Sequence, residues 1–325
     1  MGKHMRFGVF VPQGWRMDLV GIADPIEKYE AMTRVAKAAD AIPAIDSIWV
    51  YDHFHTVPKP SMETTFECWT ITAALARDTS RVNIGQMVTC NGYRNPALLA
   101  KMASTVDVLS HGRLYCGLGA GWYEHEWRAY GFGFPETRER MRMFREACEI
   151  ITKMWTEDKP TFQGEHYSID QPINEPKGAR KPHPSFWIGG SGEQVTLKLV
   201  ARFADACNFA GDPETLRRKY DILRGHCETV GRDFESITRS SNRMLFPLKP
   251  GEDPRQATEK ARAAVGATYE EYLNTVEVGT PEQLAERLQP VVDAGVNYLI
   301  AYIPDVAYDH DRLRLYAEEI IPHIR

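Results

Sequence analysis

One complete helix–strand step, from Asn95 to Gly121, constrains the fold more than any other part of this sequence. Asn95 and Pro96 mark a helix start, because an asparagine side chain can cap the first turn and a proline there sacrifices no hydrogen bond. Apolar residues then recur at spacings of three and four, which predicts a helix with one buried face. Gly112 suits the left-handed position that follows a helix end. The predicted buried face consists of Leu98, Leu99, Met102, Val106 and Leu109.

A short, mostly apolar run over residues 113–118 follows this helix, as expected of a parallel strand that is buried on both faces. The run leads directly into Gly119, Ala120 and Gly121. Small residues at the carboxyl end of a buried strand let a ligand approach the backbone closely. We therefore expect a binding site at this turn.

Short apolar strands alternate with capped helices along the whole chain, and no change in composition marks a linker. We therefore predict that residues 5–325 form a single (β/α)8 TIM barrel, with an open doubly wound sheet as the alternative. Residues 160–184 are interpreted as an insertion after the fourth βα unit that begins with a small hairpin. Residues 249–277 are interpreted as a helical segment that covers or leaves the barrel mouth. The predicted strands are 7–11, 47–51, 81–88, 113–118, 186–188, 205–210, 237–246 and 298–302.

The composition of the chain argues against several classes of protein. With 43% hydrophobic and 26% charged residues the chain can build a large core, and a net charge of −5 argues against a nucleic-acid binder. No apolar run approaches the ~18 residues of a membrane helix, and the polar start argues against a secretory signal. Six widely spaced cysteines are typical of reduced thiols and not of a disulfide framework or metal site. We expect a cytoplasmic enzyme without a metal centre.

Candidate site residues follow the predicted strands, because barrel active sites lie at the carboxyl ends of the strands. These residues are small, polar or aromatic, which suits a flat aromatic ligand better than a metal ion. His53 and His55 would point to opposite sides of an extended chain. The set consists of Gln13, Asp52, His53, Thr89, Cys90, Asn91, Gly119, Ala120, Gly121, Trp122, Tyr123, Glu124, Gly189, Gly190, Ser191, Gly192, Asn208 and Tyr302.

A glycine-rich turn, Gly189 to Gly192, runs into a predicted capping box that begins at Ser191 and opens a helix. Backbone N–H groups at the start of a helix can bind a phosphate. The alternative is a tight turn in which Ser191 caps the helix and nothing binds. The Gly-x-Gly at Gly119 is weaker, since it lacks the third glycine and the acidic residue of a dinucleotide fingerprint.

Four further candidate residues also have simpler interpretations. His53 could give or take a proton near neutral pH, or could only hydrogen-bond the backbone at a strand end. Cys90 has no evident basic partner, which argues against a nucleophile. Trp122 and Tyr123 could stack on a ligand or pack under the insertion.

The chain resembles the bacterial-luciferase-like flavin and deazaflavin oxidoreductases. The resemblance is carried by residues 94–126, which read RNPALLAKMASTVDVLSHGRLYCGLGAGWYEHE, and by residues 7–13, 47–54 and 184–192. It implies a TIM barrel that binds a tricyclic redox cofactor, and the deazaflavin branch, which uses coenzyme F420, is the most similar. Members of this superfamily often form homodimers, so a homodimer is expected here.

The resemblance also implies roles for individual residues. His53 would face the redox ring, Asp52 would orient it, and Val88 would belong to a bulge behind it that often contains a cis peptide bond. Sugar-phosphate dehydrogenases of the group carry a glutamate directly after the Gly-x-Gly, where this chain has Trp122, so a sugar phosphate is disfavoured. Glu124 is the remaining candidate acid, unless it pairs with Arg128 at i+4. The implied cofactor residues are Asp52, Val88, Thr89, Cys90, Asn91, Gly119, Ala120, Gly121, Tyr123, Gly189, Gly190, Ser191 and Gly192.

These observations predict an oxidoreductase that transfers a hydride between coenzyme F420 and a small organic substrate. An FMN-dependent two-component monooxygenase is the first alternative, and a non-catalytic flavin-binding protein of the same fold is the second. An unrelated barrel hydrolase or aldolase would need a Schiff-base lysine or a metal cluster, and neither occurs among the candidate residues.

Overall fold

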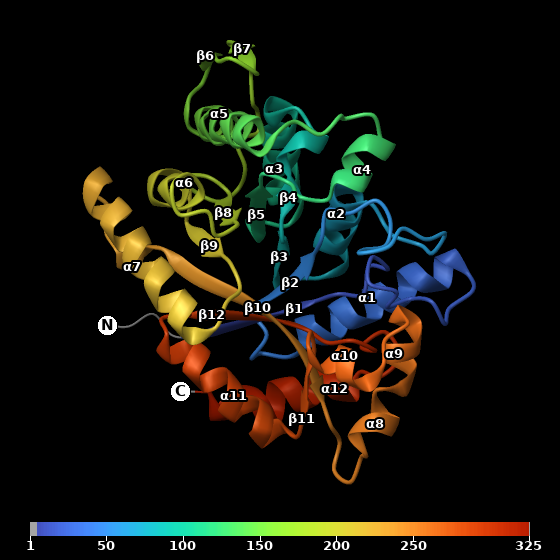
Figure 1. Cartoon of the computed structure of the whole chain (residues 1–325). Coiled ribbons are helices and arrows are strands. Elements are labelled where there is room, and N and C mark those ends of the chain that lie inside the picture. Colours follow the sequence, from blue (N-terminus) through green and yellow to red (C-terminus); the bar gives the residue numbers. More distant parts are fainter. Residues whose placement is uncertain (1–4, 325) are drawn as a thin grey trace. The chain divides into compact units, whose positions relative to one another are not determined.

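The computed structural model describes residues 5–324, which divide into two compact units. Unit 1 contains residues 5–67, 210–218 and 239–324, and unit 2 contains residues 68–209 and 219–238. Each unit is built from parallel strands and the helices that connect them (Figure 1). In the part of the chain described, no helix is long and apolar enough to cross a membrane.

Unit 1 contains a parallel sheet in the order β11-β10-β12-β1-β2. Its helices begin where the sequence provides caps, since the Asp24 side chain accepts hydrogen bonds from the N–H groups of Ile26 and Glu27. Thr280 and Gln283 form a reciprocal capping box. The strands are β1 (Arg6–Phe10), β2 (Ser47–Val50), β10 (Thr238–Pro247), β11 (Glu277–Gly279) and β12 (Tyr298–Tyr302), and the main helices are α1 (Pro25–Ala41), α11 (Pro281–Asp293) and α12 (Asp311–Leu315).

Unit 2 contains the parallel strands β3-β5-β8-β9, and β4 pairs with the end of β5. Every residue of β5 is buried, as predicted for a strand covered on both faces. The strands are β3 (Asn83–Gln86), β4 (Thr89–Cys90), β5 (Leu114–Gly119), β8 (Ser185–Gly189) and β9 (Ala206–Asn208), and the helices are α2 (Cys68–Asp78), α3 (Pro96–Leu109), α4 (Glu124–Ala129), α5 (Thr137–Thr156), α6 (Thr196–Phe203) and α7 (Pro213–Val230), which begins in unit 1.

Helix α3 starts as predicted, with the Asn95 side chain accepting a hydrogen bond from Ala97 N–H. It ends at Leu109, and both His111 and Gly112 then adopt positive φ values of 58° and 83°. The predicted burial of Leu98 is wrong, since this side chain is 55% exposed. The buried face is centred on Leu99, Ala103 and Val106, and Leu98 projects to one side of it.

The predicted capping box at Ser191 is wrong, because α6 begins at Thr196 without a side-chain cap. Contacts from α7 hold the preceding turn in another conformation. Lys219 Nζ donates to the carbonyl of Ser191 at 2.7 Å, and His226 Nε2 lies 2.9 Å from the carbonyl of Glu193. These carbonyls are thereby engaged by side chains instead of opening a helix.

The insertion contains the predicted hairpin, formed by β6 (Thr161–Gln163) and β7 (Ser168–Asp170). In Figure 1 the hairpin lies beyond α5, on the side away from β5. Glu146 of α5 accepts hydrogen bonds from the N–H groups of residues 165–167. Burial alone would raise the pKa of Glu146, but these donors hold it below its ordinary value. A charged carboxylate therefore anchors the hairpin.

The segment of residues 249–277 forms three short helices and leads into β11. Tyr272 and Val276 pack against Phe246 and Leu248, so the segment lies against the end of β10. The helices are α8 (Pro254–Ala257), α9 (Glu259–Val265) and α10 (Tyr269–Leu273), drawn in orange in Figure 1.

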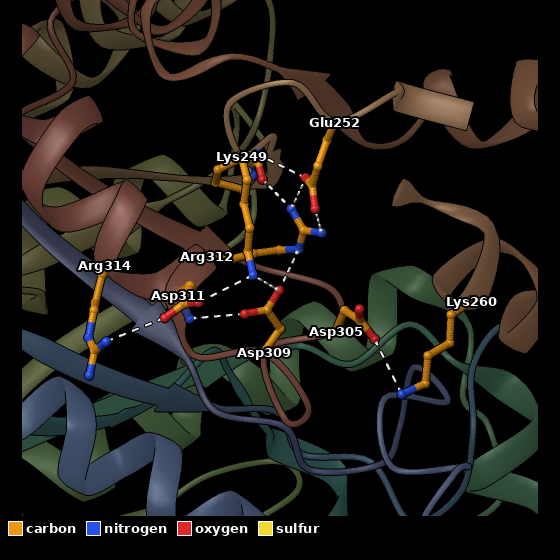
Figure 2. Close-up of polar contacts among 9 residues, drawn as sticks. Lys249, Glu252, Lys260, Asp305, Asp309, Asp311, Arg312 and Arg314 are labelled. Atoms are coloured by element: carbon orange, nitrogen blue, oxygen red, sulfur yellow. Dashed lines mark hydrogen bonds and ion pairs between the residues drawn. The ribbon is translucent and has the colours of Figure 1, made fainter. Parts of the chain in front are cut away.

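A network of charged residues fixes the start of this segment to the loop after β12 (Figure 2). Arg312 is 4% exposed and donates to both carboxylate oxygens of Glu252, at 3.0 and 3.1 Å. Lys249 Nζ lies 2.9 Å from Asp309, which raises the pKa of the lysine. Burial opposes ionisation of Glu252, but hydrogen bonds from Arg312 and Lys249 lower its pKa overall. Both shifts favour the charged forms of Lys249 and Glu252.

Replacing Arg312 by alanine should lower the free energy of unfolding by about 2–4 kcal/mol, because the Glu252 carboxylate loses its buried partner. Arg314 is 66% exposed and pairs with Asp311, so Arg314→Ala should cost no more than about 1 kcal/mol. Urea unfolding of the two variants measures the difference, and equal losses would contradict a stabilising role for the buried network.

Candidate active site

In unit 1, the predicted pair Asp52 and His53 follows the end of β2, and both residues are buried. The His53 ring stacks on the indole of Trp15, with centroids 5.1 Å apart and planes inclined by 15°. Trp15 also contacts Tyr51 at a centroid separation of 4.0 Å. The aromatic neighbours therefore restrain the plane of the imidazole. Within the described chain, the buried Trp15 Nε1 has no hydrogen-bond partner.

Asp18 and Tyr302 form a buried pair close to this aromatic cluster. The Tyr302 hydroxyl donates to Asp18 Oδ2 at 2.8 Å, and Gly14 N–H donates to Oδ1 at 2.6 Å. Burial raises the pKa of Asp18 despite these hydrogen bonds, and burial also raises the pKa of Tyr302. The sequence analysis included Tyr302 but missed Asp18, which follows no strand directly.

Gln13, a candidate from the sequence, has a structural role. Its Nε2 donates to the carbonyls of Tyr51 and Phe66 at 2.8 and 2.7 Å, and its Oε1 accepts from Tyr51 N–H at 2.8 Å. The amide is fully buried. Gln13 therefore joins the loops that follow β1 and β2.

In unit 2, the chain between β3 and β4 contains a cis peptide bond, between Met87 and Val88. Val88 packs against the backbone where β5 and β8 end. A Cβ atom on Gly119 would lie 2.6 Å from Val88 Cγ2, and one on Gly189 would lie 2.8 Å from Cγ1. These two glycines therefore leave room for the valine.

Thr89 and Asn91, which follow Val88, carry polar side chains. Thr89 Oγ1 accepts a hydrogen bond from Trp69 Nε1 at 3.0 Å. The Asn91 amide nitrogen lies 3.5 Å from the Tyr167 hydroxyl, and burial raises the pKa of Tyr167, so this phenol stays neutral. Asn91 Oδ1 is buried and has no partner in the described chain. It is an acceptor that a ligand N–H or O–H would satisfy.

Gly121 has a φ of 78°, and a Cβ atom there would lie 2.5 Å from the sulfur of buried Cys90. The same Cβ would also meet the indole of Trp127. Packing against Cys90 and Trp127 therefore favours glycine at position 121, whether or not a ligand binds there. Ala120 beside it is half-buried.

The turn from Gly189 to Gly192 keeps features of an anion site although its predicted capping box is absent. Gly190 and Gly192 are exposed, and Gly190 has a φ of 117°. The turn precedes the amino end of α6, where N–H groups favour an anion. Lys219, which the sequence analysis missed, lies with its Nζ at the Ser191 carbonyl and pairs with the Glu193 carboxylate at 3.4 Å.

Glu124 and Tyr123 lie at the start of α4. The Glu124 carboxylate pairs with Arg128 at 2.7 Å, which is the i+4 alternative, and its side chain is 54% exposed. Tyr123 is half-buried and stacks with His125 at 6.0 Å, while Trp122 is 64% exposed. A catalytic role for Glu124 stays a prediction.

Comparison with known proteins identifies the family. A model of the luciferase-like monooxygenases matches residues 5–275. The chain belongs to this family. An F420-dependent glucose-6-phosphate dehydrogenase from Amycolatopsis mediterranei is 27% identical over 311 residues, covering 86% of this chain and 90% of the relative. An FMNH(2)-dependent dimethylsulfone monooxygenase from Pseudomonas putida is 25% identical over 293 residues, covering 80% and 78%.

A solved structure of similar fold is the F420-dependent secondary alcohol dehydrogenase in complex with an F420–acetone adduct. Its TM-score is 0.76 at 20% identity, and the match covers 99% of this chain and 100% of the other. This likeness confirms the predicted (β/α)8 TIM-barrel fold. The predicted family is confirmed as well, and both predicted cofactor classes occur among the relatives.

Gly119→Ala should lower the free energy of unfolding by about 1–3 kcal/mol, because the new methyl group meets Val88. In a Val88→Ala background the same change should cost at least about 1 kcal/mol less, since the clashing methyl is gone. Gly225 of α7 has open space around its Cβ position, so Gly225→Ala should be neutral or stabilising. Urea unfolding measures the cycle, and strict additivity would contradict the packing argument.

The stability contribution of Asp18 should depend on pH. Its pKa in the folded state lies above the ordinary value of 3.8, so the folded protein holds this proton more tightly. The contribution is present at low pH and is lost as the pH rises through the folded-state pKa. Relative to Asp18→Asn, the wild type should therefore lose about 1.4 kcal/mol between pH 4 and 8 for each unit of pKa elevation. Unfolding at several pH values tests this, and a constant difference would refute it.

Proposed function

We propose that this protein is an oxidoreductase that transfers a hydride between coenzyme F420 and a small organic substrate. The observation that carries the proposal is the buried Oδ1 of Asn91, which has no partner in the described chain and directly follows β4, the strand that pairs with the end of β5. A flat ring with a polar edge fits such a place, because it can lie against small residues while donating one hydrogen bond. The F420-dependent relatives support this choice of cofactor.

The residues of unit 2 would hold the cofactor. Val88, Thr89 and Asn91 would support the ring, and the turn from Gly190 to Gly192 would bind a phosphate with the help of Lys219. When bound, F420 supplies the two-electron redox chemistry.

His53 would supply or remove the proton at the substrate oxygen. Its ring nitrogens can donate or accept a proton, and stacking on Trp15 restrains the plane of the ring. Asp52 would orient the cofactor, as the family resemblance implies. A small-molecule substrate and a homodimer are part of the proposal.

FMN-dependent monooxygenation is the second candidate, favoured by the monooxygenase relative. It differs in requiring oxygen, with which a deazaflavin reacts poorly. Calorimetric titration of the purified protein with F420 and with FMN separates the two candidates. Binding of F420 alone at micromolar concentration or tighter would support hydride transfer, as expected. Binding of FMN alone would favour the monooxygenase, and binding of neither would contradict both.

Replacing Lys219 by alanine should weaken F420 binding by about tenfold, because one charge near the phosphate is lost. The deazaflavin precursor that lacks the phosphate should bind the variant and the wild type equally. Lys198 lies on the exposed face of α6, so Lys198→Ala is the matched control and should leave F420 binding unchanged. An equal loss for both ligands would place the phosphate elsewhere.

A further inference from the structure

Unit 1 contains a cavity of about 590 Å³ that lies among the loops after β1, β2 and β12 and the helices α9 and α10. This volume is in the range that drug-sized ligands occupy, and it is far larger than a three-carbon alcohol requires. Most lining residues are apolar or aromatic, including Met17, Val57, Met244, Ala264 and Val276. The cavity thus provides a large apolar surface.

The charged residues in the lining are already engaged with protein groups. Lys260 of α9 pairs with Asp305 at 3.9 Å and lies over the Tyr308 ring at 3.1 Å, and Figure 2 shows the ion pair. The Arg16 guanidinium lies over the ring of Trp15 at 4.8 Å. These two are the only basic residues in the described lining, against the carboxylates of Asp18, Glu271 and Asp305. Such a lining disfavours a phosphate or sulfate group.

Asp18 and Tyr302 supply a polar position in this lining. Tyr302 donates to Asp18, so its phenolic oxygen can still accept one hydrogen bond. Tyr302 also lies against Trp15, at a centroid distance of 6.3 Å, and Trp15 stacks on His53. Trp15 therefore lies between Tyr302 and His53, and His53 is not among the described residues that line the cavity.

We propose that this cavity binds the substrate, and that the substrate is a bulky, largely apolar alcohol or ketone whose oxygen lies at Tyr302 and Asp18. The proposal rests on the proposed function and specifies its substrate class. Oxidation of such an alcohol removes a hydride from carbon, which the cofactor accepts, and a proton from oxygen. The Tyr302 oxygen accepts this proton as its own proton passes to the Asp18 carboxylate, so for this substrate the pair takes the proton-transfer role proposed above for His53. Ketone reduction is the reverse.

Calorimetric titration with 4-phenylcyclohexanol and 4-phenylcyclohexanone tests the proposal directly. Both should bind at least about 100-fold more tightly than acetone, because they bury far more apolar surface. Glucose 6-phosphate should give no binding at the same concentrations. Comparable binding of glucose 6-phosphate, or equal weakness of all four compounds, would overturn the proposal.

Variants locate the binding to the cavity. Ala264→Trp fills it and should weaken the apolar alcohol at least about tenfold. Glu259→Trp adds the same bulk at an exposed position of α9 outside the cavity lining, and should leave binding unchanged. Tyr302→Phe should weaken the alcohol about fivefold by removing one hydrogen-bond partner. Unchanged binding in Ala264→Trp would overturn the proposal.

The titrations are made on the protein without cofactor and again with F420 at saturation. Apolar binding without any F420 binding would refute the proposed function and retain the cavity as a site for apolar alcohols. F420 binding without apolar binding in either condition would retain the proposed function and overturn this inference.

Discussion

The packing of Val88 against the ends of β5 and β8 is the constraint on which the arrangement in unit 2 depends. Glycine is required at positions 119 and 189 because a Cβ atom at either would lie within 3 Å of a valine methyl carbon. Thr89 and Asn91, which follow Val88, are buried. The packing explanation and the ligand explanation are compatible, since the glycines that make room for Val88 also keep side chains away from the place where a ring is proposed to bind.

Local signals in the sequence predicted most element starts. Asn95, Asp24 and Thr280 each cap a helix through a hydrogen bond to a residue two or three positions away, so a short window of sequence contains the whole interaction. The strand β5 was predicted, over residues 113–118, for a similar reason, because burial on both faces demands a continuous apolar run. The barrel follows from repeating such steps.

Interactions between distant segments account for what the sequence analysis missed. The start of α6 differs because Lys219 and His226, some thirty residues away, engage the carbonyls of Ser191 and Glu193. Trp69 reaches Thr89, and Tyr167 reaches Asn91 from the insertion. No periodicity or cap marks such partners beforehand. Asp18 is the clearest case, since only the folded loop shows that this acid is buried against Tyr302.

Two ion pairs of different strength connect the segment of residues 249–277 to the part of the chain that follows β12. Arg312 is almost fully buried and binds Glu252 through two hydrogen bonds, whereas Lys260 is 56% exposed and lies 3.9 Å from Asp305. An exposed ion pair contributes about 0–1 kcal/mol, while separating a buried pair costs several times more. The start of the segment is therefore held by the buried pair of Arg312 and Glu252, whereas α9 is held by the contact of Lys260 with the Tyr308 ring and by the packing of Ala261 against the cluster around Tyr272.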